Sequence, residues 1–269
     1  MDAITTKSRD TSERRRQITA MLKQRGSVQV IPLAELFAVS TQTIRKDLHY
    51  LQERGIATRA YGGAISSDVI ATEAGAIPQE PEVEIKRTIN VGQKAQIGRL
   101  AASLVQPGDA ILLDSGTTTT QIAHFLPENA DITVVTNDFA VLAVLTEKQG
   151  INVVMLGGSL RRKNMAFYGA QTEAAIADLL VDKLFLGVDG FDLTKGITTH
   201  YEPEAMLNRK MVEVAREVIV VTDSSKFNRV CLHRIAEAQE IDILVTDSGI
   251  PAEIHDGEAA FGCKIMIAD

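Results

Sequence analysis

Residues 39–55 have the sequence VSTQTIRKDLHYLQERG, which carries signals for both ends of one helix. Ser40 is a good N-cap, because its hydroxyl can accept a hydrogen bond from an amide in the first helical turn. At the other end, Gly55 can adopt the left-handed conformation of a Schellman motif, in which Ile56 folds back onto Leu51. The stretch therefore predicts a helix that begins and ends sharply.

This helix is expected to have one apolar face and one polar face. Ile44, Leu48 and Leu51 recur at helical spacing, which predicts packing against a small core. The opposite face carries polar side chains of different reach, namely Thr41, Gln42, Arg45, Lys46 and His49. An isolated polar face of this kind is usually just solvated, so the flanking sequence has to decide between solvent and a ligand.

The polar residues suit DNA because each type matches a different part of the major groove. Arginine fits the O6 and N7 edge of guanine, glutamine fits adenine, and threonine methyl groups pack on the methyl group of thymine. Lys46 is better placed to contact a phosphate. The face therefore predicts a recognition helix that combines base contacts with backbone contacts.

The flanking segments complete a winged helix-turn-helix and favour the DNA interpretation. Residues 11–25 are expected to form a helix that Gly26 ends, and residues 32–37 a second helix after a short strand around 28–30. Residues 56–65 alternate in part and contain paired glycines, as in a hairpin. The candidate DNA contacts are Arg14, Arg15, Ser40, Thr41, Gln42, Thr43, Arg45, Lys46, His49, Arg59 and Tyr61. Solvation remains an equal alternative for the arginines near the start, and packing is the commoner role of a tyrosine such as Tyr61.

Charge is divided unevenly along the 269 residues. Residues 1–68 hold 11 Lys and Arg against 7 Asp and Glu, a net charge of +4, while the remainder holds 17 against 28, a net charge of −11. A basic module joined to an acidic body fits a nucleic acid partner at one end. Two unpaired cysteines, scattered histidines and the lack of a long apolar run predict a cytoplasmic protein with no metal site and no membrane contact.

The second half alternates apolar stretches with helix-length segments. The expected domains are a winged helix-turn-helix over 1–66, a linker over 67–84 and a second domain over 85–269. A helix is expected from about 82 to 105, and strands at 110–113, 132–136, 153–156, 183–188, 218–222, 241–246 and 264–267. Near-continuous apolar strands that alternate with helices predict an α/β fold, with a mostly parallel, Rossmann-like sheet covered on both faces.

A ligand site is expected where these strands end, because open α/β sheets bind ligands beyond the carboxyl ends of their strands. Residues 113–120, LDSGTTTT, lead from a strand into a helix and bring hydroxyls and free amides to a helix N-terminus, which favours phosphate. The alternative is that these hydroxyls only cap the helix. The candidate effector contacts are Asp114, Ser115, Gly116, Thr117, Thr118, Thr119, Asn137, Gly157, Gly158, Arg161, Asp189 and Lys226.

This mixture of hydroxyls, carboxylates and cations suits a small anionic polyol such as a sugar phosphate. The segment 113–120 matches neither GxGxxG nor GxxxxGK[ST], which disfavours a dinucleotide or a nucleoside triphosphate. No cofactor is therefore expected.

Several motifs together resemble the DeoR family of bacterial sugar-catabolism repressors over essentially the whole chain. The matching segments are 14–18, 39–48, 61–64, 113–119, 186–190 and 221–227. The resemblance implies a transcriptional repressor that binds operator DNA as a homo-oligomer, a dimer or a tetramer, and is released or weakened by a sugar-phosphate inducer. Segments 59–64, 167–169, 198–200 and 224–229 are most similar to members that control galactosamine and N-acetylgalactosamine catabolism, which implies an amino-sugar 6-phosphate or a related intermediate as effector.

The second domain also resembles ribose-5-phosphate isomerase, which makes an enzyme the rival hypothesis. The isomerase motif with acidic residues corresponds to Asp189-Gly190-Phe191-Asp192-Leu193. Lys210 stands where the resemblance places the catalytic base, and an ammonium group cannot remove a proton from carbon as a carboxylate does. Glu202 or Glu204 could substitute in principle. Binding without turnover is what a sensor needs, so a repressor is the favoured interpretation.

Overall fold

A computed structural model describes residues 11–25, 27–54, 56–60, 63–66, 80–255 and 262–269. The chain divides into two compact units, Met1–Val91 and Gly92–Asp269. The expected linker over 67–84 lies largely outside the described residues, so the two predicted boundaries, after residues 66 and 84, stay predictions. No helix within the described ranges has the length and apolar character needed to cross a membrane.

The first unit is a helix-turn-helix with a small antiparallel sheet. In the sheet β3 lies between β1 and β2 and pairs with both, so β2 and β3 form the expected hairpin. Val30, expected in the short strand, instead begins the second helix. The elements are α1 (Thr11–Arg25), β1 (Ser27–Gln29), α2 (Val30–Phe37), α3 (Thr41–Glu53), β2 (Ala57–Ala60), β3 (Gly63–Ser66) and α5 (Val83–Thr88).

Helix α3 begins and ends where its sequence predicts. The Ser40 side chain accepts a hydrogen bond from the Thr43 amide at 3.1 Å, and the Ile56 amide donates to the Leu51 carbonyl at 2.9 Å, as in a Schellman motif. The apolar stripe of α3 is buried in a core shared with α1, α2 and the sheet. The opposite face of α3 is therefore left on the surface.

The second unit is built on a seven-stranded sheet, and every strand pair in it is parallel. All seven strands fall close to the predicted stretches. They are β4 (Ala110–Leu113), β5 (Ile132–Thr136), β6 (Ile151–Met155), β9 (Val181–Gly187), β12 (Ala215–Val221), β14 (Ile243–Asp247) and β15 (Lys264–Ala268). The order across the sheet is β15-β14-β12-β9-β4-β5-β6, so the chain reverses its direction of travel between β4 and β9.

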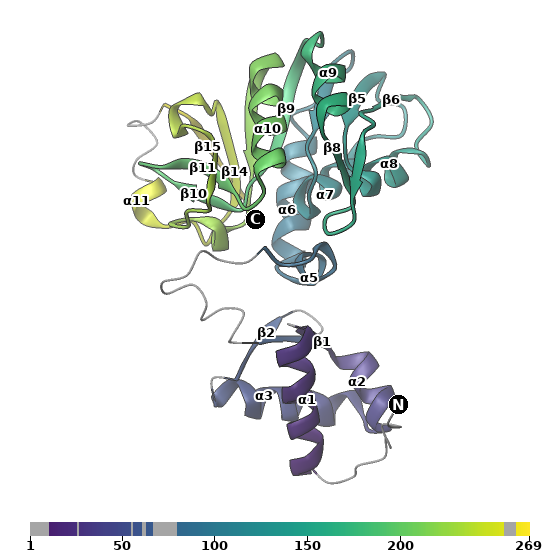
Figure 1. The fold of residues 1–269 in the computed structure, drawn as a ribbon, viewed down its shortest axis with the longest axis vertical. Helices are drawn as coiled ribbons and strands as arrows, with labels where there is room; N and C mark the ends of the chain where they lie inside the picture. Colours follow the sequence, from purple (N-terminus) through teal and green to yellow (C-terminus); the bar gives the residue numbers. More distant parts are fainter. Residues whose placement is uncertain (1–10, 26, 55, 61–62, 67–79, 256–261) are drawn as a thin grey trace. The chain divides into compact units, whose positions relative to one another are not determined.

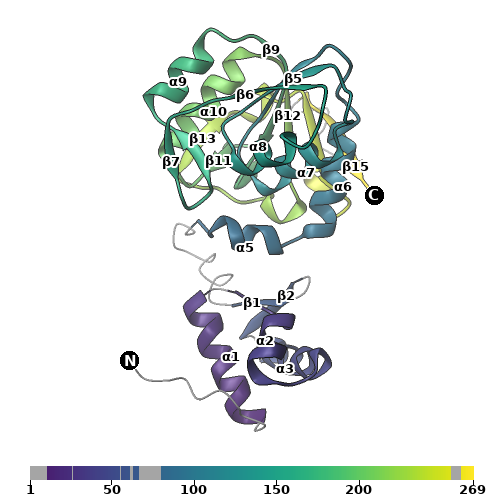
Figure 2. The same ribbon diagram turned by 90° about the vertical axis from the view of Figure 1, so that its right-hand side faces the viewer.

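Helices cover both faces of this sheet (Figures 1 and 2). Along β4, Leu112 belongs to one apolar core, and Ile111 and Leu113 belong to the other. This alternation explains why the strands are apolar throughout. The helices are α6 (Val91–Ala102), α7 (Thr117–Phe125), α8 (Phe139–Leu145), α9 (Ala170–Ala177), α10 (Glu202–Val214) and α11 (Ala252–His255).

Two antiparallel additions and one helix break were not predicted from the sequence. The additions are a hairpin of β7 (Ser159–Arg161) and β8 (Ala166–Tyr168), and a sheet of β10 (Gly190–Asp192), β11 (Gly196–Thr199) and β13 (His233–Ala236). The prediction of a single helix from 82 to 105 is wrong. It is interrupted after Thr88, because Asn90 adopts a left-handed φ of 51°, which asparagine tolerates better than most residues.

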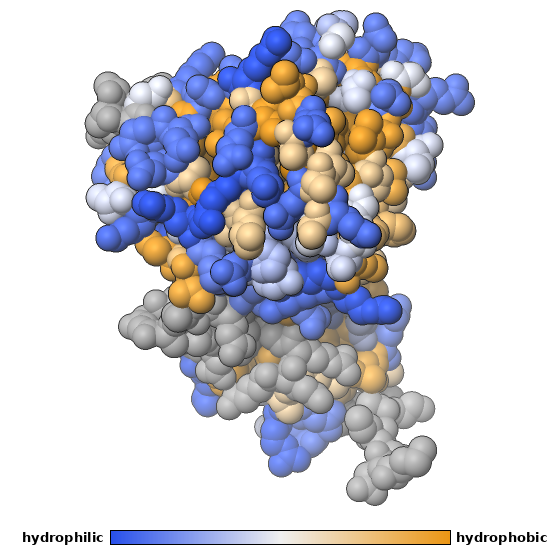
Figure 3. All heavy atoms as spheres, turned by 45° about the horizontal axis from the view of Figure 1, so that its top comes forward, coloured by the Kyte–Doolittle hydropathy of each residue, from blue (hydrophilic) through white to orange (hydrophobic). Residues whose placement is uncertain are grey.

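Some large apolar side chains of the second unit remain on the surface. Leu180 is 81% exposed and Leu232 is 61% exposed. Figure 3 shows hydrophobic areas among hydrophilic ones on the face that it presents. Single exposed leucines are common on folded proteins and do not by themselves mark an interaction site.

Candidate DNA interface and effector site

The polar face of α3 is presented to solvent as predicted. Exposed side chains on this face include Thr41, Gln42, Arg45, Lys46 and His49. Ser40 and Thr43 differ from them, because their hydroxyls bond each other at 2.9 Å while Ser40 also caps the helix. The hydroxyls of these two residues are used at the start of the helix, and the other five side chains form the surface that can bind a ligand.

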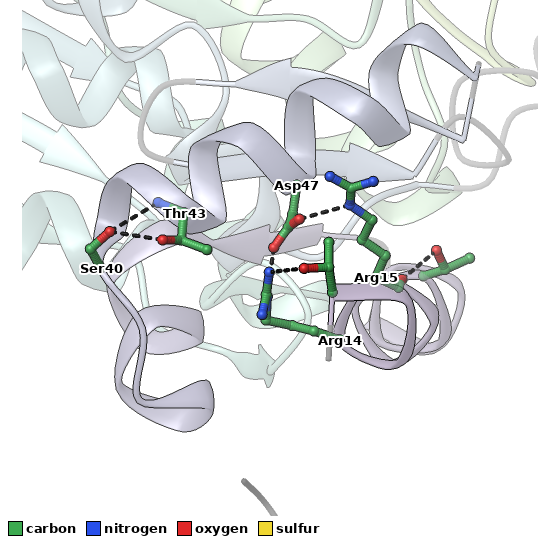
Figure 4. A network of polar contacts seen from close by, with 7 residues as sticks. Arg14, Arg15, Ser40, Thr43 and Asp47 are labelled. Atoms are coloured by element: carbon green, nitrogen blue, oxygen red, sulfur yellow. Dashed lines mark hydrogen bonds and ion pairs between the residues drawn. The ribbon is translucent and has the colours of Figure 1, made fainter. Parts of the chain in front are cut away.

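A buried carboxylate ties α3 to α1 (Figure 4). Asp47 accepts a hydrogen bond from Arg14 Nε at 2.6 Å on one oxygen and from Arg15 Nε at 2.7 Å on the other. Arg14 is only 3% exposed, so its guanidinium serves as an interior partner of Asp47. We therefore withdraw Arg14 from the candidate DNA contacts and keep Arg15, which reaches the surface in part.

The wing is only partly covered by the described residues. Arg59 lies in β2, next to the hairpin turn, and β2 pairs with β3. Tyr61 lies outside the described residues. The wing contacts therefore stay predictions.

The candidate effector residues gather around the point where the sheet reverses direction, between β4 and β9. Asp114 and Ser115 directly follow β4, and the Asp114 amide donates to the Phe185 carbonyl of β9 at 3.1 Å. Asp189 comes just after the end of β9. Ligands of open α/β sheets bind outside the strand ends at such a reversal.

Around Ser115 the side chains form a buried polar cluster. The hydroxyls of Ser115 and Tyr168 are hydrogen-bonded at 3.0 Å, and the Asn164 amide donates to the same tyrosine oxygen. Asp138, the N-cap of α8, accepts from the Gly116 amide at 3.0 Å and so already occupies one donor of the turn. The β4–α7 turn is thus held by groups from β8 and from the end of β5.

Asp114 is fully buried at the centre of this cluster. Desolvation, and then the neighbouring carboxylate of Glu204 on α10, raise the pKa of Asp114 well above its ordinary value. The nearby backbone amides of Ser115 and Gly187 offset this rise only in part. Burial and the charges of Glu204 and Asp114 also raise the pKa of Tyr168. No cation is among the groups that shift the pKa of Asp114 or Tyr168, so a cation or a hydrogen-bond donor would suit this carboxyl as a partner.

The threonines after Gly116 have mixed roles. Thr119 and Thr120 donate their hydroxyls to the Gly116 carbonyl at 2.9 and 2.7 Å, inside the first turn of α7. Thr118 is buried, whereas Thr117, the first residue of α7, is partly exposed. Capping therefore accounts for part of the Ser/Thr run, while the first amides of α7 lack acceptors within the helix and remain suited to an anion.

Gly157, Gly158, Arg161 and Asn137 surround the same edge of the sheet. The Gly157 carbonyl accepts from the Thr172 hydroxyl at 2.6 Å, and Gly158 has a φ of 137°, where any Cβ would meet Thr172. Asn137 is buried and donates to the Phe167 carbonyl at 3.0 Å. These three residues shape the backbone. Arg161 differs, because its guanidinium lies 4.0 Å from the centre of the Tyr201 ring and is partly exposed.

Asp189 and Lys226 form a second group. Lys226 Nζ lies 3.8 Å from an Asp189 carboxylate oxygen, and the Thr199 hydroxyl donates to the other oxygen at 3.3 Å. Burial and then the charge of Asp189 raise the pKa of the nearby Cys231 to about 11, which keeps this thiol protonated. Asp189 is thus already partnered, unlike Asp114.

Four residues of the cluster were not among the predicted effector contacts: Asp138, Asn164, Tyr168 and Glu204. Tyr168 comes from the unpredicted β7–β8 hairpin, and Glu204 from the first turn of α10. The sequence signal was weak, because a tyrosine before a glycine and a glutamate in a first helical turn are common. Their role depends on the fold bringing them to Asp114.

The fold and these sites define a DNA-binding regulator that carries a ligand-sensing domain. Residues 14–69 match the DeoR-like helix-turn-helix domain, and residues 89–248 match the DeoR C terminal sensor domain. The chain belongs to the DeoR family.

Relatives of known name agree with this assignment. The chain is 47% identical, over 96% of its own length and 94% of the other, to a protein of Escherichia coli O157:H7 whose name assigns it to repression of the aga operon. It is 30% identical to the glycerol-3-phosphate regulon repressor of Escherichia coli strain K12, over 90% of this chain and 93% of that one. The protein is therefore a transcriptional repressor of a sugar-related operon, and the prediction that it is no enzyme is confirmed.

Among solved structures, the ribose 5-phosphate isomerase A of Methanocaldococcus jannaschii shows a partial likeness. It is 19% identical with a TM-score of 0.39 and covers 51% of this chain and 55% of that chain. No conclusion is drawn from a likeness at this level.

Proposed function

We propose that α3 reads the operator in the major groove and that a sugar phosphate, bound at the β4–α7 turn, weakens this binding. The observation that carries the effector site is the convergence of Asp114, Ser115 and Asp189 at the reversal between β4 and β9. The amino acids there supply amides for a phosphate and carboxylates for sugar hydroxyls or an amino group.

The DNA contacts follow from the exposed face of α3. Arg45 is proposed to contact bases and Lys46 to contact a phosphate. We expect Arg45→Ala to weaken operator binding by about 1 to 3 kcal/mol while binding to random duplex changes little. Lys46→Ala should weaken binding to operator and to random duplex alike, and it should reduce the salt dependence of binding. Equal operator affinity in wild type and Arg45→Ala would remove Arg45 from base recognition.

The effector is proposed to be an amino-sugar phosphate. Support comes from the buried carboxyl of Asp114, which offers acceptors for an ammonium group, and from the relative named for the aga operon. A relative named for the glycerol-3-phosphate regulon supports a phosphorylated ligand. A thermal-shift comparison of an amino-sugar 6-phosphate with the matching neutral hexose 6-phosphate tests the class, because a ligand of the folded state raises the melting temperature.

Thr117 offers a sharp test of the phosphate position. Substituting Ser115, a buried partner of Tyr168, would disturb the cluster itself. Thr117→Asp instead places a carboxylate at the start of α7, where it favours the helix and repels phosphate. We expect this variant to bind operator DNA and to ignore the effector, while the uncharged Thr117→Asn still responds. A normal response of Thr117→Asp would exclude the turn from the site.

The protein is proposed to act as a homo-oligomer, so that two recognition helices occupy two operator half-sites. Leu180 and Leu232 of the second unit are exposed and are available for an interface between copies. Light scattering of the purified protein measures its mass in solution. A monomer at micromolar concentration that still binds a single half-site would argue against this part of the proposal.

A further inference from the structure

One aromatic ring on α3 carries two guanidinium groups. The Cζ atom of Arg15, from α1, lies 3.8 Å from the centre of the Tyr50 ring, and the Cζ atom of Arg54, at the end of α3, lies 4.5 Å from it. Guanidinium groups stack favourably on tyrosine faces. Tyr50 thus gathers two cations from different helices at one place.

The position of Tyr50 on the helix is as informative as its contacts. Tyr50 comes one helical turn after Lys46, so it borders the exposed polar face of α3 on one flank. An α-helix with its side chains is about 10 to 12 Å wide, and the major groove is about 12 Å wide. A helix in the groove therefore brings its flanks against the walls, where the phosphates lie.

The described residues balance the charges at Tyr50 only in part. Asp47 is shared by two arginines, Arg14 and Arg15, and takes only the Nε atom of Arg15. The terminal nitrogens of Arg15 meet no acceptor among the described residues, and the Arg15 side chain is 25% exposed. Arg54 is exposed and makes no ion pair with a described residue. Both guanidinium groups therefore keep donors for an anion.

We propose that Arg15 and Arg54, held on Tyr50, form a clamp for a phosphate of the operator backbone, with Asp47 as the positioning residue for Arg15. The proposal rests on the binding of DNA by α3 and adds a backbone contact at its C-terminal end. Arginine suits this task, because its planar group binds phosphate through two parallel hydrogen bonds. The competing explanation is that the ring only ties α1 to α3.

The salt dependence of DNA binding by the full-length protein separates the two explanations. Each phosphate contact contributes about 0.9 to the slope of log K against log salt, so Arg54→Ala should lower the magnitude of the slope by about 1. At about 0.15 M salt this corresponds to about fivefold weaker binding, equally for operator and random duplex. Arg216→Ala removes an exposed cation from the second unit and should leave the slope unchanged. An unchanged slope in Arg54→Ala would overturn the clamp.

Substitutions at Tyr50 and in the DNA complete the test. Tyr50→Phe keeps the ring face and should bind as wild type, whereas Tyr50→Leu should lose affinity as Arg54→Ala does. A neutral methylphosphonate can replace each phosphate of the operator in turn. At one position, Arg54→Ala and wild type should then bind the substituted duplex with the same affinity. If Arg54→Ala weakens binding by the same factor at every substituted position, Arg54 contacts no single phosphate and the clamp is wrong. If the wild-type protein does not bind DNA, the proposed DNA interface itself is wrong.

Discussion

Asp47 shows how one residue can decide the role of its neighbours. It lies on α3 among apolar side chains and yet is buried, because two arginines of α1 neutralise and bond its carboxylate. A run of three arginines at the start of a helix looks like a DNA-binding patch in the sequence. The structure instead uses the first of them inside the domain, as a bridge between the two helices.

Removing this carboxylate should destabilise the DNA-binding unit. Asp47→Asn leaves the buried Arg14 without a counter-charge, and breaking a buried ion pair in this way costs about 3 to 5 kcal/mol. Urea denaturation followed by circular dichroism measures the loss. Glu13→Gln, which breaks the more exposed pair with Arg16, is the matched control and should cost much less than Asp47→Asn. Similar losses in the two variants would contradict the bridging role of Asp47.

Asp114 should give the second unit a measurable pH dependence. Its pKa is raised in the folded state above the ordinary value of 3.8, so the folded protein holds this proton more tightly than the unfolded chain. The stability that the protonated carboxyl contributes is present below 3.8 and is lost as pH rises toward the raised pKa. We expect Asp114→Asn to gain in unfolding free energy relative to wild type as pH rises above the ordinary value of 3.8.

Glu253 provides a control of opposite sign. Hydrogen bonds from its own backbone amide and from Asn228 lower its pKa, so its contribution is lost as pH falls. Glu253→Gln should therefore lose stability relative to wild type as pH rises, by a small amount for an exposed group. If Asp114→Asn followed the same direction, the carboxyl of Asp114 would have to be charged and stabilised in the folded protein.

At the scale of elements, the position of the β4–α7 turn depends on how closely α6 approaches α7. Gly98 of α6 is buried, and a Cβ atom built on it would lie 2.5 Å from the Gln121 Cβ and 2.8 Å from the Gln121 carbonyl carbon. Two helices can approach this closely only where one of them lacks a side chain. The glycine thereby fixes how α7, and the turn at its start, lie over the sheet.

Gly98→Ala should consequently force the two helices apart. Overpacking of this kind costs about 1 to 3 kcal/mol, which chemical denaturation can measure. Gly92→Ala, on the same helix, is a close control, because no atom lies within 4 Å of the added Cβ. That variant should be neutral or gain about 0.5 to 1 kcal/mol from a better helix former. Equal effects of the two substitutions would exclude close packing at Gly98.

For the whole molecule, the proposed regulation couples the two units through one free energy. If effector binding weakens operator affinity by some factor, operator DNA must weaken effector affinity by the same factor. Couplings of this kind are typically about 1 to 3 kcal/mol, or about 5- to 150-fold. Titrating the effector into the protein with and without a saturating operator duplex measures this factor. The effector affinity could be the same with and without the duplex even though the effector releases the protein from DNA. Release would then not be an equilibrium effect.

The sequence by itself determined the elements whose causes are local. The limits of α3 follow from the Ser40 cap and from the return of Ile56 to Leu51, and the seven parallel strands follow from apolar stretches that need no partner to be recognised. Periodicity and capping act within a few residues, so they can be recognised before the fold is known.

Only the tertiary structure decided which distant groups meet. It buried Arg14 against Asp47, brought Tyr168 and Glu204 to the β4–α7 turn, and left Asp114 without a counter-charge. These outcomes depend on the order of strands in the sheet and on the packing of α1 against α3, which no local pattern encodes. Burial then set the chemistry, because a charge inside a protein must either find a partner or shift its pKa.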